Sequence, residues 1–129
     1  MPGKGSIRVL LVDDDPNFLD AVEALLERVE GIEVVGRAAS GDEALRRTAE
    51  LLPDVITMDI DMPVIDGVEA TRMIVAYFHV PVVLLTASEL DERVEEALTA
   101  GAVAHVFKTR AWDELVPTLR AVAARGRRH

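Results

Sequence analysis

Cysteine is absent from this 129-residue chain, and its absence excludes disulfides, thiol chemistry and metal sites built from thiolates. Long hydrophobic runs are absent too: no apolar stretch approaches the roughly 18 residues that a membrane span needs, and no signal-peptide core follows residues 1–6. Aromatic residues make up only 4% of the chain, and we expect Tyr77 and Trp112 to be packing residues rather than a platform for a ligand. We therefore predict a cytoplasmic protein with no membrane partner.

Positive charge is scarce, because the formal net charge is -9. This balance argues against nucleic-acid binding by the body of the protein and favours small cations or basic partner surfaces. Any contact with DNA is expected only through an effector domain outside this chain. The basic residues 125–129 are the exception. We interpret them as a solvated tail or the start of a linker, and a nucleic-acid contact is the alternative.

The length fits a single domain, which we place at residues 7–124 after a disordered segment at residues 1–6. Five runs rich in Val, Ile and Leu lack polar alternation, as expected for strands that are buried on both faces. These predicted strands are Ile7–Val12, Glu33–Ala38, Val55–Met58, Val82–Thr86 and Ala104–Lys108. Amphipathic stretches separate them, so the chain is predicted to be α/β, with a parallel sheet and helices on both faces.

The predicted helices have recognisable ends. Asp15 followed by Pro16 indicates an N-cap with proline at the first helical position. Three later pairs have the spacing of a capping box or its acidic analogue; they are Ser40 with Glu43, Asp66 with Glu69, and Ser88 with Asp91. Gly31 and Gly101 stand where helices should stop. The last helix, roughly residues 111–125, contains Pro117, which should bend it or delay its regular start.

Acidic residues follow two of the predicted strands. Asp13 and Asp14 come directly after the first strand, and Asp59 ends the third. The carboxyl ends of neighbouring parallel strands face one crevice, so these three side chains can meet although they are far apart in the sequence. The sequence therefore predicts a site for a metal ion and a phosphoryl group at this edge of the sheet.

The order of these motifs resembles the receiver domain of two-component response regulators, of the CheY-like superfamily. The motifs are the acidic pair Asp13-Asp14, the segment Asp59 to Pro63 with Asp66-Gly67 after it, Thr86-Ala87 after the fourth strand, and Lys108 after the fifth. The resemblance covers nearly the whole chain. It implies a (βα)5 flavodoxin-like, doubly wound parallel sheet with strand order 2-1-3-4-5.

The resemblance also implies roles for individual residues. Asp59 would accept the phosphoryl group, with a Mg²⁺ or Mn²⁺ ion held by Asp14, Asp59, the backbone carbonyl of Asp61 and, through a water, Asp13. Clustering these acids without metal should raise at least one pKa.

Lys108 and Thr86 would contact the phosphoryl oxygens. Thr86 and His105 would form the switch, with the side chain at position 105 rotating inward as Thr86 is drawn to the phosphoryl group. For His105 the alternative is a partly buried packing residue.

The chain departs from the family pattern after the lysine. Many receivers have proline there, whereas this chain has Lys108-Thr109, so we expect a trans peptide bond. The carboxylate of Asp61 could repel or orient the hydrolytic water, and the sequence does not decide between these effects.

Three other functions are weighed against this one. Asp59-Ile60-Asp61 matches the Asp-x-Asp core of magnesium-dependent phosphatases of the haloacid dehalogenase type, but the residues after it differ and the chain has no room for a cap domain. A nucleotide-binding module would need a glycine-rich phosphate loop, which is absent. A receiver that acts without phosphorylation is disfavoured by the complete set of acidic, threonine and lysine residues. We therefore expect no turnover of external substrates.

The expected partner is a sensor histidine kinase or a phosphotransfer protein, and a homodimer would form through the face of the fourth and fifth helices. The segments Glu33–Gly36 and Gly67–Arg72 look like receivers joined to DNA-binding domains, whereas Asp54–Asp59 looks like the receivers of chemotaxis methylesterases. A stand-alone receiver is the third alternative. We expect a response regulator with a DNA-binding effector that regulates transcription, with the methylesterase receiver and the stand-alone receiver as alternatives.

Overall fold

The protein is described by a computed structural model that covers residues 5–62, 67–88 and 92–126. The strands are β1 (Ile7–Val12), β2 (Ile32–Ala38), β3 (Val55–Asp59), β4 (Val82–Thr86) and β5 (Ala104–Phe107). The helices are α1 (Pro16–Glu27), α2 (Gly41–Leu51), α3 (Gly67–Phe78), α4 (Arg93–Thr99) and α5 (Ala111–Gly126). A short 3-10 helix, Lys108–Arg110, joins β5 to α5.

The five strands form one sheet in the order β2-β1-β3-β4-β5, and every neighbouring pair is parallel. This confirms the predicted (βα)5 flavodoxin-like architecture. Each observed strand boundary lies within one residue of its prediction. One correction concerns Lys108, which was predicted to end the last strand but begins the 3-10 helix.

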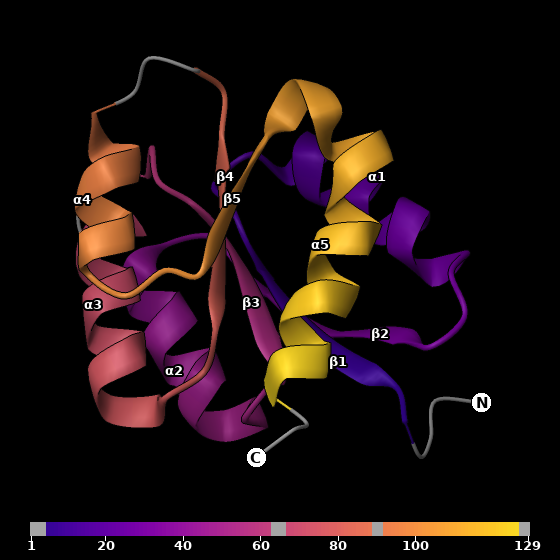
Figure 1. Ribbon diagram of the computed structural model, residues 1–129, viewed down its shortest axis with the longest axis horizontal. Coiled ribbons are helices and arrows are strands. Elements are labelled where there is room, and N and C mark those ends of the chain that lie inside the picture. Colours follow the sequence, from indigo (N-terminus) through magenta and orange to yellow (C-terminus); the bar gives the residue numbers. More distant parts are fainter. Residues whose placement is uncertain (1–4, 63–66, 89–91, 127–129) are drawn as a thin grey trace.

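Helices cover both faces of the sheet, as Figure 1 shows, with α1 and α5 on one side and α2, α3 and α4 on the other. Alternate residues of the central strands therefore enter different cores. Leu10, Ile56 and Leu84 pack on the side of α2, α3 and α4. Val9, Val55 and Val83, each one residue away, pack on the side of α1 and α5. Burial on both faces explains why these strands have no polar alternation.

Two predicted helix starts are confirmed by hydrogen bonds. The side chain of Asp15 accepts from the backbone N–H of Asn17 at 3.0 Å, and that of Ser40 accepts from Glu43 at 3.1 Å. The start predicted from Ser88 and Asp91 is wrong, because α4 begins at Arg93 with Glu92 as its N-cap. Asp91 itself lies outside the described residues, as does Asp66.

Of the two predicted stop glycines, Gly101 lies just after the end of α4, with a left-handed φ of 123°. Gly31 has a φ of 83°, but it lies in the turn into β2 because α1 has already ended at Glu27 with Arg28 as its C-cap.

The last helix is longer than predicted. Pro117 lies inside α5, which starts at Ala111, so the proline does not delay the helix start. Arg125 and Gly126, assigned to the basic tail, continue the helix. Residues 127–129 lie outside the described part of the chain, as do residues 1–4 of the segment predicted to be disordered.

Two further predictions concern residues on the surface and in the backbone. Tyr77 and Trp112 were expected to be packing residues, but both side chains are exposed. The prediction of a trans bond after Lys108 agrees with the absence of cis peptide bonds in the described residues. Among the helices of the described residues, none has the length and apolar character needed to cross a bilayer.

Gly67 packs α3 directly against the end of β3. A Cβ atom at this position would lie 2.4 Å from the backbone oxygen of Asp59 and 2.5 Å from the Cα of Ile60. Because backbone atoms cannot move aside cheaply, we expect Gly67→Ala to lower the free energy of unfolding by about 1–3 kcal/mol, as overpacking does elsewhere.

Urea denaturation measures this loss, and Gly126→Ala is the matched control. A Cβ at Gly126 would meet no atom within 4 Å, so this change should leave stability unchanged or raise it by up to about 1 kcal/mol. Equal effects of the two substitutions would contradict the packing argument.

Candidate phosphoryl-acceptor site

The register of the sheet brings the functional residues to one edge. Val12 is paired with Met58, so the next residues, Asp13 just after β1 and Asp59 at the end of β3, lie side by side. Thr86 is the last residue of β4 and is paired with Phe107, which places Lys108 one residue beyond β5. The carboxyl ends of four adjacent strands thus supply the site, as expected for a parallel α/β sheet.

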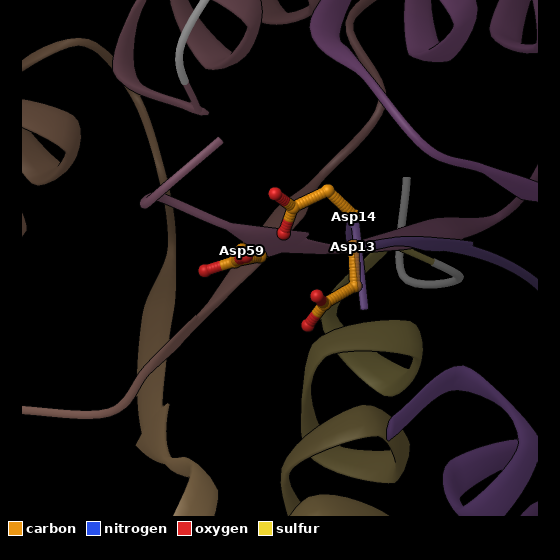
Figure 2. A group of neighbouring side chains, drawn as sticks. All are labelled: Asp13, Asp14 and Asp59. Atoms are coloured by element: carbon orange, nitrogen blue, oxygen red, sulfur yellow. The ribbon is translucent and has the colours of Figure 1, made fainter. Parts of the chain in front are cut away.

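Three carboxylates share a small space at this edge. One oxygen from each of Asp13, Asp14 and Asp59 lies within 4.8 Å of the other two, and Figure 2 shows the three side chains at the ends of their strands. Asp13 and Asp59 are buried, whereas Asp14 is exposed. The structure thus brings together the three acidic residues that the sequence predicts to meet.

Lys108 supplies the positive charge beside these acids. Its Nζ lies 2.7 Å from Oδ2 of Asp13 and 3.7 Å from Oδ2 of Asp59. The ammonium therefore pairs more closely with the residue predicted to hold a metal-bound water than with the predicted acceptor. Lys108 is largely buried, so solvent screens these two ion pairs less than surface pairs.

The electrostatics of the site act mainly on Asp59. The pKa of Asp59 is raised from 3.8 to about 7; burial is the largest cause, the nearby charge of Asp13 is the next, and the charge of Lys108 opposes the shift. A hydrogen bond with Asp13 and the charge of Asp14 also favour the protonated form. The prediction that at least one pKa is raised is confirmed, although burial is a larger cause than repulsion between the carboxylates.

The acidic group fits a hard divalent cation. Asp13 uses Oδ1 to accept the backbone N–H of Asp15 at 2.9 Å. Its buried Oδ2 faces the Lys108 ammonium at 2.7 Å and accepts no other hydrogen bond within the described part of the chain. Because a carboxylate oxygen has two lone pairs, Oδ2 can also accept a cation-bound water. Oxygen ligands from two or three carboxylates suit Mg²⁺, which keeps several waters.

The loop after β3 is tied to α4 by a contact that the sequence analysis missed. Arg93 forms an ion pair with the carboxylate of Asp61 and donates to the backbone oxygen of Ile60 at 3.2 Å. The N–H of Asp61 donates to Oδ1 of Asp59 at 3.1 Å. The loop that carries the proposed carbonyl ligand is thereby fixed from both sides. No local sequence signal pairs residues 61 and 93.

The two predicted switch residues differ in exposure. Thr86 is fully buried, and its hydroxyl lies 3.3 Å from both the backbone nitrogen and the oxygen of Ser88. His105 is exposed and packs edge-on against Phe107, with ring centroids 5.4 Å apart. Its side chain is therefore on the surface rather than partly buried, and its role in a switch stays a prediction.

The fold and the site together define a receiver-type α/β domain, with an acidic cluster facing a lysine at the carboxyl edge of the sheet. The sequence matches the response regulator receiver domain family over residues 9–120. The chain belongs to this family.

The proteins with similar sequences include regulators and an enzyme by name. The chain is 40% identical over 119 residues to "Response regulator GacA" of Pseudomonas viridiflava, covering 92% of this chain and 56% of that protein. It is 39% identical over 118 residues to "Transcriptional regulatory protein LiaR" of Bacillus subtilis, covering 91% and 56%. It is 36% identical over 115 residues to a protein-glutamate methylesterase/protein-glutamine glutaminase of Geobacter sulfurreducens, covering 88% and 31%.

A solved structure agrees over nearly the whole chain. The response regulator domain of Thermotoga maritima CheB superposes with a TM-score of 0.86 at 32% identity, covering 92% of this chain and 97% of that one. By contrast, the chain spans about half the length of GacA and LiaR. The likeness to those two relatives therefore concerns only the matched part of each.

Proposed function

We propose that this chain accepts a phosphoryl group on Asp59 from a sensor histidine kinase or a phosphotransfer protein, in a reaction that depends on Mg²⁺ or Mn²⁺. The observation that carries the proposal is the convergence of Asp13, Asp14 and Asp59 beside the ammonium of Lys108. Membership of the receiver family supports the same assignment.

The ionised carboxylate of Asp59 is the nucleophile. Its oxygen forms a bond to phosphorus while the bond from phosphorus to the donor nitrogen or oxygen breaks, which leaves a mixed anhydride on the protein. Asp14, Asp59 and the backbone carbonyl of Asp61 would hold the metal ion, and Asp13 would hold one of its waters. A bound divalent ion supplies the positive charge that lets two anions approach each other.

Two further residues act on the phosphoryl oxygens. Lys108 lies 3.7 Å from Asp59, within reach of a group bound to that carboxylate, and its charge stabilises the transition state. The hydroxyl of Thr86 donates to another phosphoryl oxygen. To do so, Thr86 would give up its contacts with Ser88, and its movement towards the phosphoryl group would draw the loop after β4 inward. This movement would open space for His105 to rotate from the surface.

The output would pass through the face formed by α4, β5 and α5. Leu98 of α4 and Val103, which directly precedes β5, are exposed apolar residues, and His105 of β5 is also exposed. A homodimer or an attached effector would bind here when the switch is set. The similarity to LiaR supports an effector that regulates transcription. A methylesterase and a stand-alone receiver are the alternatives.

Incubation with acetyl phosphate and Mg²⁺, followed by intact-mass measurement, tests the proposed chemistry. We expect a mass gain of one phosphoryl group with Mg²⁺ and no gain with excess EDTA, because the carboxylates repel the donor when no cation offsets their charge. Release of phosphate from p-nitrophenyl phosphate is measured in parallel. Steady release from this ester would contradict the proposal and favour a phosphatase instead.

A further inference from the structure

Lys108 has an aromatic neighbour in addition to Asp13 and Asp59. Its Nζ lies 4.5 Å from the centroid of the Phe18 ring, in the first turn of α1. The face of an aromatic ring attracts a cation through its quadrupole, without accepting a directed hydrogen bond. The N–H groups of the ammonium therefore stay available for carboxylate and phosphoryl oxygens.

The position of the Phe18 ring is itself supported. Phe18 is half-buried and packs against the core under α1 and α5. Trp112, in the first turn of α5, meets the Phe18 ring edge to face, with centroids 6.2 Å apart and planes at 68°. Trp112 is exposed and is the only tryptophan of the chain. Two helices thus hold one aromatic face against the ammonium.

A lysine needs such support more than most charged residues do. Its ammonium ends a flexible stem of four carbons, so its position is set by its neighbours rather than by its own geometry. In this protein Asp13 lies 1 Å closer to Nζ than Asp59 does, at 2.7 Å against 3.7 Å. The Phe18 ring, 4.5 Å from Nζ, is a further contact that restricts where the ammonium can lie between these two carboxylates.

We propose that Phe18 is a positioning residue that seats the Lys108 ammonium beside Asp59, with Trp112 holding the Phe18 ring in place. This inference rests on the proposed function, because Lys108 must act on a phosphoryl group at Asp59. It predicts that the rate of phosphorylation depends more on an aromatic ring at position 18 than on the apolar volume of that side chain.

The test compares Phe18→Leu, which keeps an apolar side chain but removes the ring, with Phe18→Tyr, which keeps the ring. Phe78→Leu is the matched control, because Phe78 is also half-buried but packs against the other core at the far end of α3. With acetyl phosphate and Mg²⁺, Phe18→Leu should slow phosphorylation roughly two- to tenfold, the range of a cation–π contact. Phe18→Tyr and Phe78→Leu should stay close to the parent.

A second measurement needs neither metal nor phosphoryl donor. The chain has only two lysines, Lys4 and Lys108, so the NMR signals of their ε-methylene groups can be assigned with a single Lys4→Arg variant. The ring current of Phe18 should shift the Lys108 signal upfield in the parent and in Phe18→Tyr. The shift should disappear in Phe18→Leu and persist in Phe78→Leu.

The possible results separate the two claims. An unshifted Lys108 signal in the parent overturns the claim that the ammonium of Lys108 lies against the Phe18 ring. If Phe18→Leu abolishes the shift and yet slows phosphorylation no more than Phe78→Leu does, that result overturns the positioning role. A parent that gains no phosphoryl group overturns the proposed function and the positioning role with it, while the NMR result still decides whether the ring seats the ammonium.

Discussion

Replacing Lys108 with alanine is expected to slow phosphorylation of Asp59 by about 100-fold or more, the usual effect of removing one preorganised charge from a transition state. In the described residues the ammonium of Lys108 is the cationic group that forms ion pairs with Asp13 and Asp59. Its loss removes the charge that faces the phosphoryl oxygens. It also removes a positive charge that lowers the pKa of Asp59, so less of the nucleophile is ionised.

The rate of mass gain with acetyl phosphate measures this effect, and metal binding separates it from unfolding. Titration calorimetry with Mg²⁺ should give an affinity equal to that of the parent or higher, because a positive charge near the acids has been removed. Arg110→Ala is the control, since Arg110 is an exposed neighbour whose ion pair is with Glu114 at 3.7 Å. A Lys108→Ala rate within twofold of the Arg110→Ala rate would mean that Lys108 has no part in the reaction.

Replacing Asp59 with asparagine is expected to stabilise the metal-free protein at neutral and alkaline pH. The pKa of Asp59 is about 7 in the folded protein against 3.8 for the ordinary group. Below pH 3.8 the carboxyl is protonated in both states, and no penalty arises. Between pH 3.8 and 7 the unfolded chain ionises first, so folding becomes less favourable as the pH rises, and above 7 the penalty is constant. A shift of this size corresponds to at most about 4 kcal/mol.

Urea denaturation in EDTA at several pH values measures the difference between Asp59→Asn and the parent. The gain should be absent near pH 4, grow up to pH 7 and then level off. Asp42→Asn is the control, because Asp42 is an exposed residue in the first turn of α2. The stability difference between Asp42→Asn and the parent should not show this rise between pH 4 and pH 7. Added Mg²⁺ should stabilise the parent more than Asp59→Asn, because asparagine is the weaker ligand. A gain that is equal at pH 4 and pH 8 would show that ionisation of Asp59 is not its cause.

The sheet and the acidic site were predictable because both follow from local sequence patterns. Strands buried on both faces need continuous apolar runs, so β1 and β4 were predicted to the residue. The parallel order of the strands then fixes which strand ends meet, so the sequence alone predicts that Asp13, Asp14 and Asp59 lie together. The caps at Asp15 and Ser40 are equally local.

Contacts between separate elements were not predictable in the same way. The ion pair of Arg93 with Asp61 and the ring of Phe18 near Lys108 depend on how α4 and α1 pack, which no spacing along the chain encodes. An aromatic residue in the first turn after Asp13 and Asp14 was visible, but nothing local linked it to Lys108. Exposure of Trp112 and Tyr77 was missed because their residue types favour burial.

The most direct test of the account is the intact mass of three proteins after incubation with acetyl phosphate and Mg²⁺. The parent and Asp42→Asn should each gain one phosphoryl group, and Asp59→Asn should gain none. A phosphoryl group on Asp59→Asn, or none on the parent, would contradict the assignment of Asp59 as the acceptor.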